Sequence, residues 1–285
     1  MKVQELMESF LRGETKPLAA GDEAAWYQLW NEKGLGELSP RASALQGGLL
    51  ADRLPWVFVA AYQAVIRSVF PDVPLQGWAA FAATEDKRDP DAHPGTRLCE
   101  TGSVIKLNGY KSWVAQSRHV DHLVVTARGE DGEQHCVYLE RSQPGVTLTH
   151  REAPGFLGAM SQGLAQLEEV EIRRECIYPG SRIASFVHSE PPFVMLASAA
   201  FLLGQLRDAD AGLRDALATL TLALYELCNE QWDEEPPPPK ILAALDRILQ
   251  DCVVRFEAAV DLSTQPGWSE DRRLLSMYSG RIQSA

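Results

Sequence analysis

One short stretch of the sequence, NGYKSWVA, contains the residue types best suited to binding a flat molecule. Its Asn108-Gly109 pair lies between two apolar runs, and this pattern predicts a hairpin with a type I′ turn. After the turn, strand alternation would put Lys111, Trp113 and Ala115 on one face. A Trp beside a small residue can form a wall on which a planar ring stacks. The alternative is that Trp113 only fills the core of a β-domain.

Two further stretches give this hairpin a context. FAATEDKRDPD spans Phe81–Asp91, and PGFLGAMSQGLAQLEEVEIRRECIYPG spans Pro154–Gly180. Together with NGYKSWVAQS they resemble the middle domain of the acyl-CoA dehydrogenase family, which carries a Thr-Glu-Pro-x-Ala-Gly-Ser-Asp stretch and an Asn-Gly-x-Lys-x-Trp-Ile-Thr hairpin. The resemblance covers Trp78–Gly180, and it extends to the flanking helical regions only by type and order.

The resemblance implies a flavoprotein that oxidises an acyl-CoA or a related acyl thioester to the 2,3-enoyl thioester. In that reaction a carboxylate removes the acidic α-proton, while hydride passes from the β-carbon to N5 of FAD. Backbone amides and the Thr84 hydroxyl would suit the O2, N3 and O4 edge of the flavin. The cofactor-binding residues that the resemblance implies are Phe81, Ala83 and Thr84 on one side of the flavin, and Trp113, Val114 and Ala115 on the other.

Three positions depart from the family pattern. Pro90 replaces a Ser associated with substrate binding, and Ala115 replaces the hydroxyl residue near N5. If Gly204 is the glycine that ends the apolar run of the first C-terminal helix, Met195 replaces an Arg. A lost hydrogen bond to developing charge is worth roughly 1.5–3 kcal/mol, or about ten- to hundredfold in rate. The sequence therefore leaves two main possibilities: an oxidoreductase with a degenerate active site, or a non-catalytic partner or binding subunit that has lost FAD chemistry. A third possibility is that the barrel and bundle host an unrelated ligand.

The catalytic base is expected near the C-terminal end of the sequence. Family members often place a Glu shortly after a Gly-Gly-x-Gly-Tyr stretch, and Glu270 lies near the corresponding place after Trp268. The alternative role of Glu270 is that of a first-turn carboxylate that stabilises the helix dipole. A metal site is not expected, because the spacing of His119 and His122 would splay the two rings apart.

Composition narrows the possible partners. The chain of 285 residues has a formal net charge of −12, which disfavours nucleic acid as a partner. We identified no apolar run near the ~18 residues of a membrane span and no signal-peptide pattern, so a cytoplasmic protein is expected. Its five scattered cysteines are expected to be reduced thiols. The expected partners are an acyl-CoA or related acyl thioester and other subunits of a homo- or hetero-oligomer, without nucleic acid or membrane.

The pattern of apolar and turn residues divides the sequence into three regions. Residues 1–74 and 183–285 have helical patterns, and residues 75–182 have short apolar runs separated by turn residues. These patterns predict an α+β, acyl-CoA dehydrogenase-like fold: N-terminal helices, a central antiparallel β-barrel or sandwich, and a C-terminal helical bundle. Both helical regions are shorter than is typical of the family. Other expected features are helices at Val3–Leu11, Glu23–Glu32 and Leu49–Phe70, a stiff connector at residues 233–239, and Ser269 as the N-cap of the last helix.

Overall fold

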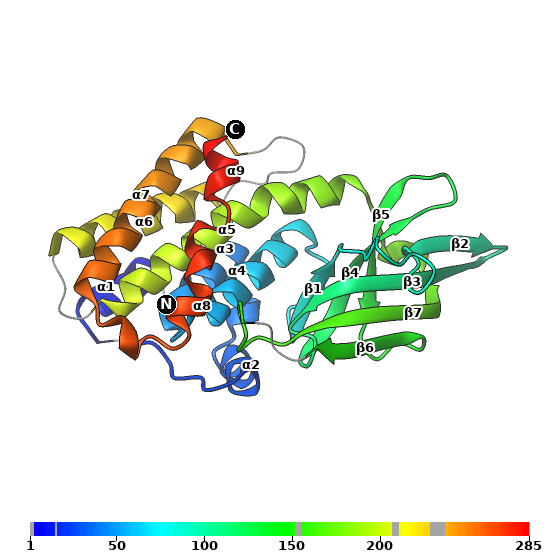
Figure 1. Cartoon of the computed structure of the whole chain (residues 1–285), viewed down its shortest axis with the longest axis horizontal. Coiled ribbons are helices and arrows are strands. Elements are labelled where there is room, and N and C mark those ends of the chain that lie inside the picture. The colour runs from blue at the N-terminus through cyan, green and yellow to red at the C-terminus, as the bar shows by residue number, and fades with distance from the viewer. Residues whose placement is uncertain (1–2, 15, 152–154, 207–210, 229–236, 285) are drawn as a thin grey trace.

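The computed structural model describes residues 3–14, 16–151, 155–206, 211–228 and 237–284. Helices gather at one end of the long axis and strands at the other, with α4 and α5 running between them (Figure 1). The helices are α1 Val3–Leu11, α2 Glu23–Glu32, α3 Pro40–Leu50, α4 Leu54–Val69, α5 Ser181–Gln205, α6 Ala211–Leu227, α7 Pro239–Ala259, α8 Trp268–Asp271 and α9 Ser279–Gln283. The strands are β1 Trp78–Ala82, β2 Arg97–Thr101, β3 Val104–Ala115, β4 Val120–Arg128, β5 Gln134–Glu140, β6 Val146–Arg151, β7 Gln162–Ile172 and β8 Ile177–Pro179.

This order of elements confirms the predicted architecture of helices, β-domain and helices. The described strands form one sheet in the order β6-β7-β3-β2-β4-β5-β8, and β1 pairs with β4. The β1–β4 pair is parallel, as is the short β2–β4 contact, so the sheet is mixed rather than wholly antiparallel. A parallel β1–β4 pair is possible because β2 and β3 lie between these strands in the chain, so that no hairpin joins them.

The predicted turn at Asn108-Gly109 is wrong, because both residues lie inside the continuous strand β3. The β2–β3 hairpin instead turns after Thr101, at Gly102, whose φ is 64°. Gly109 has a φ of 140°, and a Cβ atom on it would lie 2.4 Å from the Cα of Thr96. Glycine is thus needed here for a strained strand backbone that lies close to the segment before β2.

The predicted common face of Lys111, Trp113 and Ala115 is also wrong. The pairing of β3 with β7 shifts register between Lys111 and Val114, which breaks the strict alternation of the strand. Lys111 is fully buried and bonds to Thr126 of β4, whereas Trp113 packs against α4.

Two helical expectations need correction. The apolar stretch Leu49–Phe70 is divided between α3 and α4, and Pro55 lies in the first turn of α4, where its missing N–H costs nothing. The last stretch begins at Trp268, capped by Gly267 with a φ of 68°, so Ser269 lies inside α8 and is not its N-cap. Most of the expected connector at 233–239 lies outside the described residues, and Pro239 begins α7.

Helix α5 forms the centre of the helical region. It has the length and mean hydropathy of a membrane-spanning helix, but 83% of its apolar window is buried within the protein. Gly48 of α3 packs against it so closely that an added Cβ would lie 2.4 Å from the carbonyl oxygen of Ala197. These features are those of a core helix.

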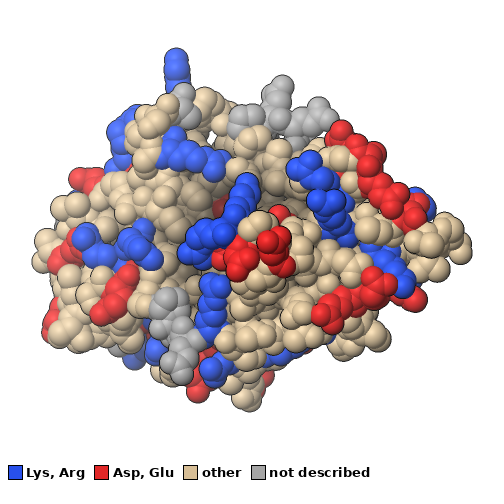
Figure 2. Space-filling model, turned by 45° about the vertical axis from the view of Figure 1, so that its right-hand side comes forward, with Lys and Arg blue, Asp and Glu red and all other residues tan. Residues whose placement is uncertain are grey.

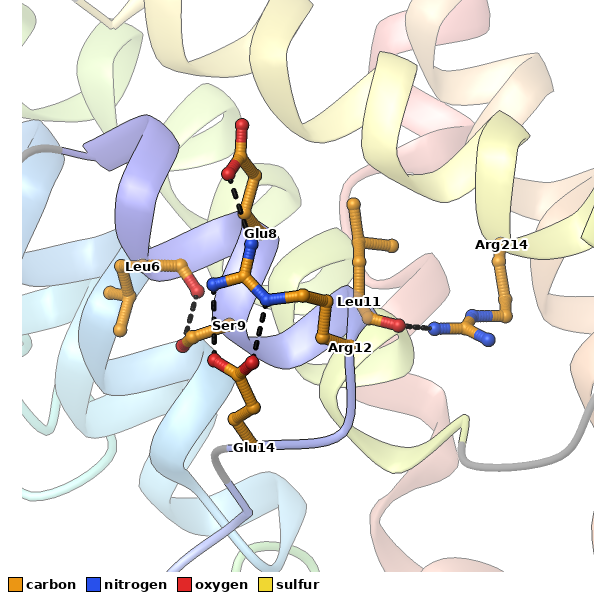
Figure 3. A network of polar contacts seen from close by, with 7 residues as sticks. All are labelled: Leu6, Glu8, Ser9, Leu11, Arg12, Glu14 and Arg214. Atoms are coloured by element: carbon orange, nitrogen blue, oxygen red, sulfur yellow. Dashed lines mark hydrogen bonds and ion pairs between the residues drawn. The ribbon is translucent and has the colours of Figure 1, made fainter.

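Figure 3 shows the polar contacts around the C-terminal end of the first helix, one of which joins it to the helical body. Arg12 lies between two carboxylates, with its guanidinium 3.1 Å from Glu8 and 2.7 Å from Glu14. Arg214 of α6 donates a hydrogen bond to the carbonyl oxygen of Leu11. Because the ion pairs of Arg12 are exposed, each contributes at most about 1 kcal/mol.

Candidate functional site

Trp113 lies at the boundary between the sheet and the helices. Its ring contacts Phe58 and Tyr62 of α4 edge to face, with centroid distances of 6.4 and 6.2 Å. Its indole nitrogen donates a hydrogen bond to Oε1 of Gln162 at 3.0 Å. The side chain is only partly buried, so the indole is held in place without being sealed inside the sheet.

Phe81 of β1 packs against aromatic residues of the helical region. Its ring stacks on Phe186 of α5 at 4.2 Å and on Phe70 at 5.7 Å, and the residue is 6% exposed. The Tyr62 hydroxyl donates to the Phe81 carbonyl at 2.8 Å and accepts from the Phe81 N–H at 2.9 Å. Tyr62 therefore joins α4 to β1 and also touches Trp113.

The segment after β1 comes alongside the Trp113 region of β3. The N–H of Ser112 donates to the carbonyl of Thr84 at 2.8 Å, and the side chains of Ala83 and Thr84 are exposed. Val114 and Ala115, by contrast, are fully buried. Of the six residues that the resemblance implies, the accessible side chains are Ala83, Thr84 and Trp113, and the buried ones are Phe81, Val114 and Ala115.

A carboxylate missed by the sequence analysis lies close to these aromatic residues. Glu190 of α5 is hydrogen-bonded to Tyr278. Burial raises the pKa of Glu190, although the Tyr278 hydrogen bond and the charge of Arg281 oppose this shift. Its charge in turn acts on Tyr62, whose pKa is raised mainly by burial. The signal in the sequence is that Glu190 is the one acidic residue in the segment that forms α5.

Pro191, directly after Glu190, interrupts the backbone hydrogen bonding of α5. Pro191 has no N–H, so the carbonyl of Val187 lacks the hydrogen bond that a regular helix would give it. Arg281, in α9, donates to this carbonyl at 3.2 Å. The C-terminal helix α9 thus supplies both a replacement donor and a positive charge next to Glu190.

Glu270, the base expected from the sequence, is exposed at the end of a short helix. Ser269 donates a hydrogen bond to its carboxylate at 2.5 Å, and this bond lowers the pKa of Glu270. Its neighbour Asp271 faces inward and accepts a hydrogen bond from the N–H of Leu157 at 2.5 Å. Its role as a base stays a prediction.

The other predicted positions are dispersed. Pro90 is exposed in the segment between β1 and β2, whereas Met195 is 3% exposed within α5. His119 stacks on Tyr27, and His122 lies 3.0 Å from the Tyr138 hydroxyl, so the two imidazoles have separate partners.

Pockets of different size are lined by residues of the β-domain. The lining of a pocket of about 320 Å³ includes Ala83 and Glu85, and Glu85 forms an ion pair with the buried Lys111. A larger one, of about 970 Å³, lies at the far end of the sheet near Tyr138, Glu171 and Cys176. The larger pocket is not lined by any of the six implied flavin residues.

The arrangement of helices, mixed sheet and helices defines an acyl-CoA dehydrogenase-like fold. No protein-family model matches the sequence. The structure is similar to an FAD-dependent dehydrogenase, with a TM-score of 0.64 and 15% identity over 99% of this chain and 97% of that chain. It is also similar to the prolyl acyl carrier protein oxidase AnaB, with a TM-score of 0.60 and 14% identity over 99% and 97%. Butyryl-CoA dehydrogenase from Megasphaera elsdenii gives a TM-score of 0.58 and 12% identity over 99% and 94%. At these identities the similarity establishes the fold.

Proposed function

We propose that this protein is an FAD-dependent oxidoreductase that acts on the CH–CH bond of an acyl thioester, with Glu190 as the base. The observation that carries the proposal is the partly buried carboxylate of Glu190, whose charge acts on Tyr62, and the Tyr62 ring lies 6.2 Å from that of Trp113. The fold and the resemblance of residues 78–180 to the acyl-CoA dehydrogenase family support the same reaction class. A fold alone does not determine activity, which depends on the chemistry of individual residues.

The accessible residues beside β3 fit a flavin in part. Trp113 offers a fixed, partly exposed indole. Thr84 offers an exposed side chain with a hydroxyl, and its carbonyl accepts from the N–H of Ser112, the residue next to Trp113. When bound, FAD would supply the hydride acceptor. Ala115 cannot donate a hydrogen bond from its side chain, and it is fully buried. Donors to the cofactor on that side must therefore come from the backbone.

Glu190 has the properties that proton abstraction requires. A base works best when its pKa lies near the operating pH, and burial raises the pKa of this carboxylate toward that range. Tyr278 and Arg281 favour the charged form, so the carboxylate is available to accept a proton. Tyr62, bonded to the β1 backbone on one side, fixes the aromatic surface between Glu190 and Trp113.

A second candidate function is a binding protein with this fold but without the chemistry. The changes at Pro90, Ala115 and Met195 favour it, because they fall in three separate parts of the implied site. Absorbance of the purified protein, before and after incubation with FAD, distinguishes the two. A yellow protein, or saturable quenching of FAD fluorescence, supports the oxidoreductase, whereas indifference to saturating FAD supports the binding protein.

The role of Glu190 is tested by anaerobic mixing of the FAD-loaded protein with a panel of acyl-CoA and acyl-pantetheine thioesters. We expect flavin bleaching in the wild type and a loss of roughly 10²–10⁴-fold in its rate in Glu190→Gln, with FAD affinity unchanged. Glu270→Gln is the matched control, because it makes the same change in an exposed carboxylate. If bleaching survives in Glu190→Gln and is lost in Glu270→Gln, Glu270 is the base.

A further inference from the structure

A small pocket in the β-domain is surrounded by cations. Its volume is about 320 Å³, at the small end of the range of ligand sites. Lys87, Arg97 and Arg128 line it with exposed side chains, and Thr126 and Gln134 add polar groups. In a chain with a formal net charge of −12, three cations around one pocket are a local exception.

The nearest carboxylate in the pocket is already neutralised. Glu85 lies 2.7 Å from the ammonium of Lys111, a side chain with 0% exposure, and also accepts from the N–H of Thr96 at 3.0 Å. Among the residues that the structure describes, Lys87, Arg97 and Arg128 form no ion pair. The positive charge of these three side chains is therefore left unbalanced.

The strand register forces two of these cations together. Arg97 of β2 and Arg128 of β4 are direct partners in the parallel contact between the strands, and the N–H of Arg128 donates to Thr96 at 3.0 Å. Like charges directly opposite each other destabilise a sheet. A bound anion would remove this repulsion, and a pair of guanidinium groups can bind phosphate oxygens in the bidentate manner.

The pocket adjoins the implied flavin surface and shares Ala83 with it. It is lined by every second residue of the segment after β1, namely Ala83, Glu85 and Lys87, as expected for one side of an extended chain. Thr84, whose hydroxyl would face the flavin, does not line it. On the face in Figure 2, basic and acidic side chains are interspersed.

We propose that this pocket binds a phosphate ester or pyrophosphate group of a small molecule, held by Arg97, Arg128 and Lys87. The proposal does not depend on the flavin and thioester chemistry proposed above. Glu85 lines the pocket, and its ion pair with the buried Lys111 reduces the repulsion between its charge and the anion.

The test is calorimetric titration of the purified full chain with inorganic pyrophosphate at low and at physiological salt. We expect saturable 1:1 binding that weakens with salt, and at least tenfold weaker binding in Arg128→Gln and in Arg97→Gln. Lys240→Gln, which removes an exposed cation from α7, is the control and should stay within twofold of the wild type. Circular dichroism establishes that each variant is folded. Absence of saturable binding to the wild type, or equal loss in Lys240→Gln, overturns the proposal.

Titrations with coenzyme A and with FAD identify the source of the phosphate. If Arg128→Gln weakens binding of coenzyme A alone, the group belongs to the thioester substrate, and if it weakens FAD alone, the group belongs to the cofactor. If it weakens only pyrophosphate, the ligand is a separate phosphorylated metabolite. Unchanged affinity of Arg128→Gln and Arg97→Gln for all three probes would contradict the site, whether or not the protein oxidises thioesters.

Discussion

The ammonium of Lys111 lies 2.7 Å from Oε1 of Glu85 and 2.9 Å from Oγ1 of Thr126, joining β3, β4 and the segment after β1. The two charges differ in environment, because the Lys111 side chain is 0% exposed and that of Glu85 is 30% exposed. Burial lowers the pKa of Lys111, although the hydrogen bond from its ammonium to Glu85 opposes the shift. The pair is therefore asymmetric: the lysine depends on the glutamate more than the reverse.

We expect Glu85→Gln to destabilise the fold more than Lys111→Met does. Glu85→Gln leaves a buried ammonium without a counter-ion, which costs about 3–5 kcal/mol. Lys111→Met leaves a carboxylate that water can still reach, and the cost should be about 1–3 kcal/mol. Free energies of unfolding from urea titrations at pH 7 measure both. Glu133→Gln, at an exposed position, is the control. The asymmetry is refuted if the methionine variant is the less stable of the two.

Features set by local patterns could be predicted from the sequence. The helices Val3–Leu11 and Glu23–Glu32 occur at the predicted bounds, and the side chain of Asp22 caps the second by accepting from Ala25. The order of helical, β and helical regions also follows from periodicity, since amphipathic and alternating patterns need no knowledge of distant contacts.

Features set by tertiary contacts could not be predicted. Asn108-Gly109 has the composition of a turn, but Gly109 is required by the approach of Thr96, which no local pattern encodes. Glu190 was missed because its significance depends on Tyr278, 88 positions later in the chain, and on Tyr62 from another helix. The register shift that separates Lys111 from Trp113 likewise depends on β7.

Glu190 should make the stability of the protein depend on pH. Burial raises its pKa above the ordinary value of 4.5, so the folded state favours the protonated form. Its contribution to stability is fully present below pH 4.5 and is lost as pH rises through the folded-state pKa. Glu190→Gln, which is neutral at every pH, should therefore match the wild type near pH 4.5. At pH 8 it should be more stable by about 1–3 kcal/mol. Urea unfolding at both values measures the difference.

The control for this pH effect is Glu270→Gln. The hydrogen bond from Ser269 lowers the pKa of the exposed Glu270, so ionisation favours the folded state and the variant should gain no stability at pH 8. A gain of equal size in both variants would show a general effect of removing negative charge from the protein. Such a result would contradict a specific penalty at Glu190.

Tyr278→Phe should change the pH dependence of flavin reduction. Its hydrogen bond lowers the pKa of Glu190, so removing the hydroxyl should raise that pKa and move the acidic limb of the rate profile to higher pH. Stopped-flow reduction of the FAD-loaded protein by a thioester, from pH 5 to pH 9, measures the limb. The matched control is Tyr225→Phe in α6, where the ring lies under Arg41 of α3, and it should leave the profile unchanged. A uniform loss of rate without a shift would restrict Tyr278 to a structural role.

Gly109 should tolerate substitution far less well than the glycine of the true hairpin turn. Its φ of 140° is accessible to glycine almost alone, and an added Cβ would overlap the backbone of Thr96 at 2.4 Å. Gly109→Ala should therefore destabilise the protein by at least about 2 kcal/mol. Gly102 has a φ of 64° with open space around it, and Asn adopts this conformation readily, so Gly102→Asn should cost at most about 1 kcal/mol. Thermal and urea unfolding of the two variants compare these costs directly. If Gly109→Ala were as stable as Gly102→Asn, the close approach of β3 to the segment before β2 would not constrain the fold.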